Sequence, residues 1–379
     1  MKKGNPIFYS TILLTGANFL LRLAGISFQV YLSNRIGAAG IGLLQLVLSV
    51  SALSFTVGSA GIRTCAMYLS AGELGRNRPD NVHSVLTGCF RYSLLFSGMT
   101  AAALWWAAPW LSWVWIGDGA ATAALRLCAL FLPLRCLRGV LTGYLTAAQR
   151  VGSLVAAAFL EQGCAMSVTF LLLSRRVGVS SGQAALAMTA GSCAADALGF
   201  LVLLRLRERR VPRRERRPPY RQILQVSLPL ALADALRSGL NTIEDVIIPR
   251  QLTLFAGTVN AMADYGMIRG MVFPVLMFPA AILFSLAELL VPEFSRCAAR
   301  GSKNRIQYLA RQGLRAAMLF GLCAGGLLFV LAGPLGRLLY QSNQAGRLLR
   351  LYAPFVPMLY MDALVDAMWD QNNEWAVKE

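Results

Sequence analysis

Residues 125–133 read LRLCALFLP, and residues 349–357 read LRLYAPFVP. Six of the nine aligned positions are identical, at a separation of 224 residues. The same separation relates Gly42 to Gly266. A period this long is not that of a solenoid built from small repeats, which lies between about 20 and 50 residues. We therefore predict a lobe of several hydrophobic segments that occurs twice along the chain.

The composition indicates a protein of the lipid bilayer. Of the 379 residues, 56% are hydrophobic and only 14% are charged, whereas an ordinary soluble domain carries about 25% charged residues. Residues 41–62 and 92–116 contain no ionised side chain. Each of these two segments exceeds the roughly 20 residues that a helix needs to cross the hydrocarbon core. Both are therefore predicted transmembrane helices.

Eight further apolar segments complete the predicted architecture. They cover residues 7–31, 127–146, 151–174, 181–204, 223–248, 267–290, 314–333 and 350–368. The apolar runs are continuous rather than alternating, which favours helices over membrane strands. The amino-terminal run continues past Leu20 without an A-x-A site, so we do not expect a cleavable signal peptide. The predicted fold class is all-α, a polytopic membrane protein with about ten transmembrane helices.

The formal charge of +18 is distributed as a topology signal and not as a nucleic-acid surface. Nine arginines crowd the loop between the sixth and seventh predicted helices: Arg205, Arg207, Arg209, Arg210, Arg213, Arg214, Arg216, Arg217 and Arg221. The positive-inside rule then places both termini in the cytoplasm, with the chain in the cell membrane. Attraction of this loop to anionic membrane lipids is compatible with the same topology. We expect no nucleic-acid partner.

The repeat and the loop together define the predicted domains. A first six-helix lobe covers residues 1–206, an Arg/Pro-rich cytoplasmic linker covers 207–221, and a second lobe covers 222–379. An even number of helices per lobe makes the two repeats parallel, related by an axis along the membrane normal. Continuing the repeat would carry the second lobe well past Glu379. We therefore expect this lobe to be incomplete, with about four helices.

Other site classes find little support in the sequence. The eight cysteines are scattered and form no C-x-x-C pair, so we expect neither a disulfide nor a metal site, since buried cysteine usually acts as a small hydrophobic residue. No G-x-x-x-x-G-K-[ST] loop for ATP is present. We predict no catalytic residues and no cofactor. Five tryptophans between positions 105 and 115 are typical of an interfacial aromatic belt, with a carbohydrate-stacking platform as the alternative.

Several short motifs resemble those of a known transporter family. They are Arg-Leu-Ala-Gly at 22–25, Gly-Ala-Ala-Gly-Ile-Gly-Leu-Leu-Gln at 37–45, Ala-Gly-Ile-Arg at 60–63, Glu-Asp-x-x-Ile-Pro-Arg at 244–250 and Leu-x-x-Pro-Glu-Phe-Ser-Arg at 289–296. Together they are similar to the polysaccharide-transporter and stage V sporulation protein B branch of the multidrug/oligosaccharidyl-lipid/polysaccharide (MOP) exporter superfamily. The resemblance covers essentially the whole chain. It implies two six-helix lobes facing a cavity, and export of drugs or flipping of lipid-linked sugars by alternating access.

Intramembrane arginines are the candidate cargo-binding residues. A charge at the centre of a transmembrane helix costs roughly 2.5 to 3.5 kcal/mol on translocon scales, so Arg22 is not expected to face lipid. Alignment of the first and seventh helices superposes Arg22 on Arg237, and Arg63 and Arg269 lie at the ends of neighbouring spans. Guanidinium groups bind phosphate oxygens bidentately, so these four residues predict a cationic cavity for a lipid-linked sugar diphosphate. Arg135 and Arg138 are second-rank candidates for the same cavity.

Carboxylates in the same segments leave an alternative open. Asp234, Glu244 and Asp245 lie in the seventh helix and are candidates for ion coupling, and Glu161 and Asp196 lie in the first lobe. Asp234 and Arg237 are three residues apart and share a helix face. Any single arginine could therefore serve internal charge neutralisation instead of cargo binding.

Three functions are compatible with these patterns. The first is a flippase for a lipid-linked oligosaccharide or polysaccharide precursor in envelope or spore-cortex assembly, with envelope-assembly proteins as partners. The second is an ion-coupled multidrug exporter of small amphiphiles. The third is a truncated, nontransporting remnant or scaffold subunit. All three predict a membrane protein that is not an enzyme.

Overall fold

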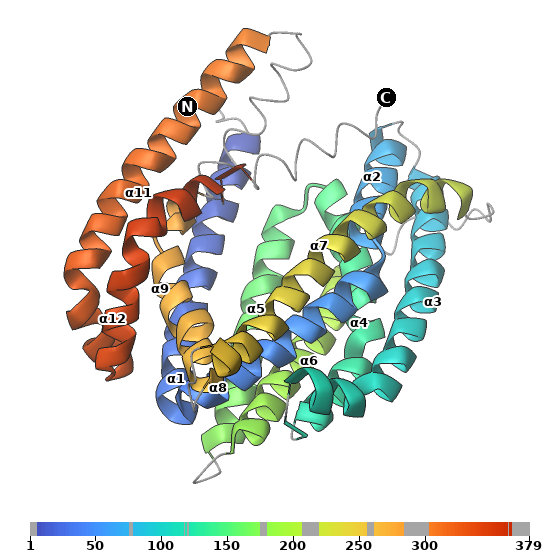
Figure 1. Cartoon of the computed structure of the whole chain (residues 1–379). Coiled ribbons are helices and arrows are strands. Elements are labelled where there is room, and N and C mark those ends of the chain that lie inside the picture. The colour runs from blue at the N-terminus through green and yellow to red at the C-terminus, as the bar shows by residue number, and fades with distance from the viewer. Residues whose placement is uncertain are drawn as a thin grey trace. The chain divides into compact units, whose positions relative to one another are not determined.

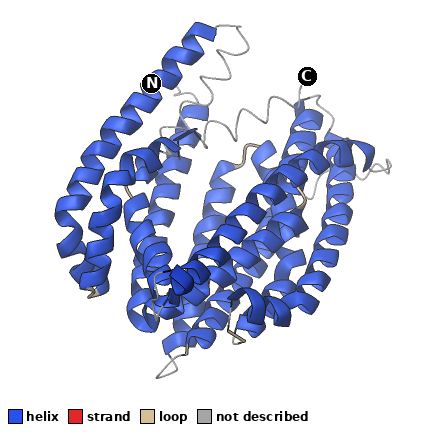
Figure 2. Ribbon diagram, viewed as in Figure 1, coloured by secondary structure: helices blue, strands red, loops and turns tan. Residues whose placement is uncertain are grey.

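The structure is a computed structural model that describes residues 6–75, 79–116, 118–119, 121–174, 180–206, 220–255, 261–283, 303–362 and 364–365. Within these ranges the chain forms helices and no strand (Figure 2). Among the described residues, six helical segments are long and apolar enough to cross a membrane by length and composition. The all-α membrane fold is thus confirmed, while the number of ten spans stays a prediction.

Helices form over the hydrophobic segments of the sequence, although their bounds differ from the predicted spans at several places (Figure 1). In chain order they are α1 (Pro6–Ser59), α2 (Ile62–Gly75), α3 (Pro79–Leu111), α4 (Ala121–Ala147), α5 (Val151–Ser174), α6 (Ser181–Leu206), α7 (Tyr220–Phe255), α8 (Ala261–Tyr265), α9 (Phe273–Met277), α11 (Lys303–Tyr340) and α12 (Asn343–Tyr352). Two π-helices, η1 (Ser112–Ile116) and η2 (Gly266–Val272), and one 3-10 turn, η3 (Ala353–Phe355), continue α3, α8 and α12. Most of the predicted linker, residues 207–219, lies outside the described residues.

A glycine separates the first two predicted spans. α1 runs through both, but Gly37 has φ 75° and ψ 174°, which breaks the helix there. A positive φ of this size is readily adopted only by glycine, because other residues bring Cβ against the backbone. The predicted boundary between residues 31 and 41 is therefore a kink rather than a loop.

The helices pack into two compact units. The larger unit is Ala39–Tyr265, and the smaller unit combines Met1–Ala38 with Gly266–Glu379. The first part of α1 is thus grouped with the carboxyl-terminal half of the chain, and α7 with the amino-terminal half. This grouping by spatial contact differs from the lobes 1–206 and 222–379 inferred from the repeat. The lobe boundaries, the incompleteness of the second lobe and the parallel relation of the repeats stay predictions.

In the larger unit, α4 is the central helix. It packs against α2, α3 and α6, and α5 packs on α6. The core around α2 contains Ile62, Cys65 and Ala66, all fully buried, together with Leu141 and Leu145 of α4. Between membrane-spanning helices such side chains stabilise the contact by van der Waals packing, because lipid tails are as apolar as the core. α4 therefore fixes the position of the start of α2.

In the smaller unit, side chains from distant segments bind the carbonyl groups of the irregular helix η2–α9. Gln29 Nε2 donates to Gly270 O at 2.7 Å, Tyr340 Oη donates to Met271 O at 2.9 Å, and Tyr360 Oη donates to Leu276 O at 2.7 Å. A π-helix leaves carbonyl groups displaced from regular α-helical pairing. Gln29 and Tyr340 bind carbonyls of the π-helix itself, and Tyr360 binds one in the following helix α9, so side chains stabilise this irregular segment.

The two copies of the repeated nonapeptide differ in one structural respect. The first copy lies inside the continuous helix α4, whereas the second begins in α12 and enters η3 at Ala353. Pro354 occupies the position of Leu130 in the first copy. Proline has no N–H to donate and its ring clashes with the preceding turn. One substitution thus accounts for the change of helix type.

Exposed side chains mark the lipid-facing surface of α3. Leu95, Met99, Trp106 and Trp110 are spaced by four, seven and four residues, and all four are exposed. Such spacing places them on one face of a helix. The stripe changes from aliphatic residues to tryptophan near the end of α3. This arrangement is the one expected of an interfacial aromatic belt.

Candidate cargo cavity

A cavity of about 360 Å³ lies within the larger unit. It is lined by residues from the end of α1, the start of α2, α4 and α7. These residues are Phe55, Thr56, Ser59, Gly61, Ile62, Arg63, Thr64, Cys136, Gly139, Asp234, Arg237, Ser238 and Asn241. Two of the four predicted cargo arginines and one predicted coupling carboxylate therefore line the same cavity.

The turn between α1 and α2 brings Arg63 to the cavity. α1 ends at Ser59, and Ala60 and Gly61 both have positive φ, 43° and 67°. A Cβ added to Gly61 would also meet Ser227 O of α7 at 2.9 Å. Two features therefore require glycine at position 61: the positive φ and the close approach of α7. Arg63 then lies in the first turn of α2, so the sequence interpretation that it ends the second span is refined.

Glycines of α4 hold the backbone at Arg63. A Cβ added to Gly143 would collide with Arg63 O, and one added to Gly139 would lie 3.9 Å from Arg63 Cβ. Small residues of this kind let transmembrane helices approach closely. The backbone of Arg63 is consequently fixed against α4, while its side chain is exposed at the cavity.

One face of α7 supplies the opposite wall. Asp234, Arg237, Ser238 and Asn241 are spaced by three, one and three residues, which places them on one side of the helix. The guanidinium groups of Arg63 and Arg237 are the charged donors of the cavity. The hydroxyl groups of Thr64 and Ser238 and the amide of Asn241 add neutral donors, whereas the hydroxyls of Thr56 and Ser59 donate to the backbone carbonyls of Ala52 and Thr56. Phosphate oxygens are the ligands that such a donor set suits best.

The second-rank arginines occupy a different environment. Arg138 makes an ion pair with Glu161 of α5 and another with Asp196 of α6, at 3.3 Å between Arg138 Nη2 and Asp196 Oδ1. Arg135 Nε lies 3.8 Å from Asp196 Oδ2, and the Arg135 guanidinium lies 4.5 Å from the ring centre of Phe55. We call these four charged residues the α4–α6 cluster. Neither arginine is among the lining residues of the cavity.

The chain makes room for this cluster with Gly199. A Cβ at this position of α6 would overlap the carboxylate of Glu161. Sequence reasoning noted Glu161 and Asp196 as carboxylates but assigned them no partners. A charge in an apolar segment is a usable signal, since such residues pair with one another. The identity of the partner depends on helix packing, which a single sequence does not reveal.

A known transporter family matches most of this chain. The model of the family described as "Lipid II flippase MurJ" matches residues 76–373. The chain belongs to the MurJ family of lipid II flippases. It is therefore a membrane transporter of the MOP exporter superfamily and not an enzyme, as the sequence motifs predict.

Curated relatives of this MurJ-family chain include two proteins of Bacillus subtilis (strain 168). The chain is 23% identical to stage V sporulation protein B over 374 residues, covering 96% of the chain and 72% of that protein. It is 24% identical to the sporulation protein YkvU over 368 residues, covering 93% of the chain and 79% of that protein. The sporulation branch that the motifs indicate is thus among its relatives.

Solved structures with the same fold include multidrug transporters. An inward-facing multidrug resistance MATE family transporter of the MOP superfamily aligns with a TM-score of 0.72 at 13% identity, covering 96% of the chain and 85% of that structure. An outward-facing conformation of a MATE family transporter aligns with a TM-score of 0.65 at 16% identity, covering 98% of the chain and 84% of that structure. At these identities the likeness concerns the fold alone.

The other two predicted cargo arginines belong to the smaller unit. Arg22 is partly buried on α1. Arg269 lies in η2, and its guanidinium is 5.7 Å from the ring centre of Phe273. The structure thus places two candidate arginines in each unit of this MurJ-family chain. A common site for all four stays a prediction.

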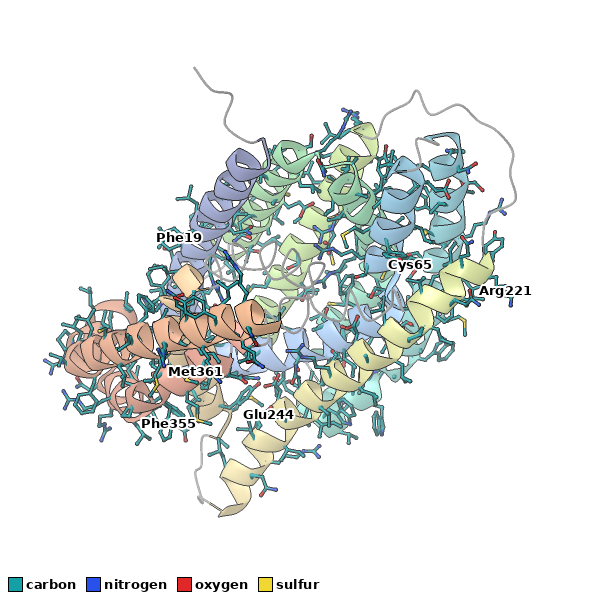
Figure 3. All side chains as sticks on the ribbon, turned by 90° about the horizontal axis from the view of Figure 1, so that it is seen from above. Phe19, Cys65, Arg221, Glu244, Phe355 and Met361 are labelled. Atoms are coloured by element: carbon teal, nitrogen blue, oxygen red, sulfur yellow. The ribbon has the colours of Figure 1, made fainter. Side chains whose placement is uncertain are left out.

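The three candidate coupling carboxylates are separated along α7. Asp234 lines the cavity. Asp245 is buried, with 9% of its surface exposed, and Ser49 Oγ donates to Asp245 Oδ2 at 2.8 Å. Glu244 is exposed on α7 (Figure 3). Asp245 stays a candidate for ion coupling because it is buried and accepts a hydrogen bond. Asp234 stays a candidate because it lines the cavity.

Proposed function

We propose that the chain flips a lipid-linked oligosaccharide or polysaccharide precursor across the bacterial cytoplasmic membrane by alternating access. The observation that carries this proposal is the presence of Arg63 and Arg237 in one cavity, beside three neutral hydrogen-bond donors. A sugar diphosphate on a lipid carries the charge that two guanidinium groups bind. Membership of the MurJ family and the relation to stage V sporulation protein B support a precursor of envelope or spore-cortex assembly.

The cargo is expected to place its diphosphate between α2 and α7. Arg63 binds from the first turn of α2, and Arg237 binds from the middle of α7. Asp234, next to Arg237 on the same face, offsets one of the two positive charges. We propose that Arg22 and Arg269, which belong to the smaller unit, also bind the cargo.

A flipping assay in proteoliposomes tests this function. Wild-type protein, Arg63→Gln and Arg237→Gln are reconstituted with a fluorescent polyprenyl diphosphate oligosaccharide, and its accessibility to an external quencher is followed. We expect each variant to lose at least about tenfold in rate, since a hydrogen bond to a charged group contributes about 1.5 to 3 kcal/mol. Arg347→Gln, which removes an exposed charge of α12, serves as the matched control. Wild-type rates in both cavity variants would refute the proposal.

A second candidate function is ion-coupled export of small amphiphiles. Asp234 in the cavity favours it, because a carboxylate binds a cationic drug or a coupling ion directly. This function predicts that Asp234→Asn abolishes drug resistance, whereas the flippase tolerates that change. Under the third alternative, a scaffold or remnant, wild-type protein would show no movement of either cargo. We also propose that the arginine-rich loop binds anionic lipids and that both termini lie in the cytoplasm. Envelope-assembly proteins are the proposed partners.

A further inference from the structure

α11 is longer than the membrane it crosses. Its 38 residues give a length of about 57 Å at 1.5 Å per residue, whereas the hydrocarbon core measures about 30 Å and the whole bilayer about 40 to 45 Å. The most apolar part of the helix is the predicted span 314–333. The first three turns of α11 therefore extend through the headgroup region and beyond it.

The outward face of α11 is one continuous stripe. Buried positions such as Ala317, Ala324 and Leu328 define the inward face. Opposite them lie Tyr308, Arg311, Arg315, Met318, Leu322 and Phe329, all exposed and spaced by three, four, three, four and seven residues. Such spacing keeps all six residues on one side of the helix. The stripe thus runs unbroken from the start of α11 into its apolar middle.

The chemistry of this stripe changes abruptly between Arg315 and Met318. From Met318 onward it is apolar, as a lipid-facing surface must be. Before that point it carries two arginines and a tyrosine. Tyr308 has 62% of its surface exposed, and among the described residues neither Arg311 nor Arg315 makes an ion pair. Two adjacent turns therefore present two guanidinium groups and one phenol where lipid chains give way to headgroups.

The start of α11 also lies on the side where anionic lipids are available. It is at the same end of the smaller unit as the start of α1 (Figure 1), the end that the positive-inside rule assigns to the cytoplasm. The cytoplasmic leaflet carries a negative surface potential that attracts basic segments next to the membrane. Arginine binds phosphate bidentately, and tyrosine prefers the interface.

We propose that Tyr308, Arg311 and Arg315 form a binding site for the phosphate headgroup of an acidic phospholipid, whose chains lie along Met318 and Leu322. None of the three residues is among those that line the cargo cavity. The site binds a structural lipid rather than cargo. Its occupancy holds the long helix at a fixed depth in the bilayer.

Lipid retention by the purified protein tests the site. Protein is incubated with phosphatidylglycerol or with phosphatidylcholine, then stripped with mild detergent, and bound lipids are counted by native mass spectrometry. We expect wild-type protein to retain phosphatidylglycerol selectively. Arg311→Gln/Arg315→Gln should weaken retention by about fivefold per residue, the contribution of one basic side chain at an anionic surface. Arg311→Lys/Arg315→Lys should keep most of the selectivity, because its charge is unchanged.

A matched control removes the same charge elsewhere. Arg337→Gln/Arg347→Gln takes two exposed arginines from the other end of α11 and from α12, and it should retain phosphatidylglycerol like the wild type. All variants must elute as single species before the comparison. Equal retention by Arg311→Gln/Arg315→Gln and wild type would overturn the proposal, as would an equal loss in the control pair. Neither outcome bears on the flipping assay, so the two proposals fail independently.

Discussion

Two groups of arginines in the larger unit show how different roles can be assigned to one residue type. Arg135 and Arg138 are partly buried beside Glu161 and Asp196, which balance both positive charges. Arg63 and Arg237 are exposed at a cavity whose other polar side chains are mostly neutral. Charge in an apolar segment therefore does not by itself identify a cargo site. What distinguishes the two groups is the number of carboxylates within reach.

The largest expected effect is on the stability of the α4–α6 cluster. Asp196→Ala removes the carboxylate that both arginines share and leaves buried positive charge without compensation. Breaking a buried ion pair in this way costs about 3 to 5 kcal/mol of unfolding free energy. We expect a large fall in the thermal midpoint in detergent, measured by fluorescence-detected size exclusion. Arg63→Ala, in the same assay, should shift the midpoint little, and equal shifts would contradict the distinction.

The next effect separates the two groups by ligand binding. Inorganic pyrophosphate should stabilise the wild-type protein against heat, because a ligand that binds the folded state raises its stability. The double variant Arg63→Gln/Arg237→Gln should lose this gain, at about 1.5 to 3 kcal/mol per charged hydrogen bond. The double variant Arg138→Gln/Glu161→Gln, which removes a balanced pair, should keep it. Loss of pyrophosphate stabilisation in the cluster variant alone would reverse the assignment.

A smaller effect tests how closely α6 approaches Glu161. Gly199→Ala places a methyl group where the carboxylate lies, and overpacking of this kind costs about 1 to 3 kcal/mol. Gly163→Ala on α5 is the control, since nothing lies within 4 Å of its added Cβ. On a Glu161→Ala background the cost of Gly199→Ala should largely disappear. The thermal midpoints of the four variants measure how strongly the two substitutions depend on each other. If Gly199→Ala lowers the midpoint equally with and without Glu161→Ala, the two residues are not in contact.

The smallest effect concerns the carboxylates of α7. Ser49→Ala removes the hydroxyl that donates to Asp245, and loss of one such bond costs about 1 kcal/mol. Glu244→Gln changes an exposed side chain and should stay within about 0.5 kcal/mol of wild type. Chemical denaturation in detergent resolves the difference. If both substitutions cost the same, burial of Asp245 has no energetic consequence.

The sequence predicts the helices better than their partners. Hydrophobic runs place α5 and α6 almost residue for residue, because a membrane span must be apolar and about 20 residues long. Residue type and position along the spans select Arg63 and Arg237, which line the cavity, together with Arg22 and Arg269, which are not among its lining residues. By contrast, the pairing of Arg138 with Glu161 and Asp196 depends on which helices lie side by side. The fit of α6 against Glu161 depends on one residue, Gly199. The hydrophobic periodicity of the sequence does not reveal a contact of this kind.

Grouping in space is the other property that the repeat does not reveal. The alignment of residues 125–133 with 349–357 predicts a duplication along the chain. The compact units instead group the first part of α1 with the carboxyl-terminal half. Gly37 lies next to the boundary at which α1 passes from one unit to the other. A glycine in the sequence permits a positive φ at this position but does not show that the helix breaks there. Ancestry along the chain and contact in space are therefore separate questions for this fold.

Phe55 has a consequence for both arginine groups at once. One face of its ring carries the Arg135 guanidinium, and the same side chain lines the cavity. The ring is thus a partition shared by two compartments. A shift of Arg135 toward or away from Asp196 would move the Phe55 ring. A ligand that displaces the Phe55 ring from the cavity side would in turn disturb the α4–α6 cluster. The balanced charges and the exposed ones, so unlike in their partners, are mechanically connected through a single benzyl group.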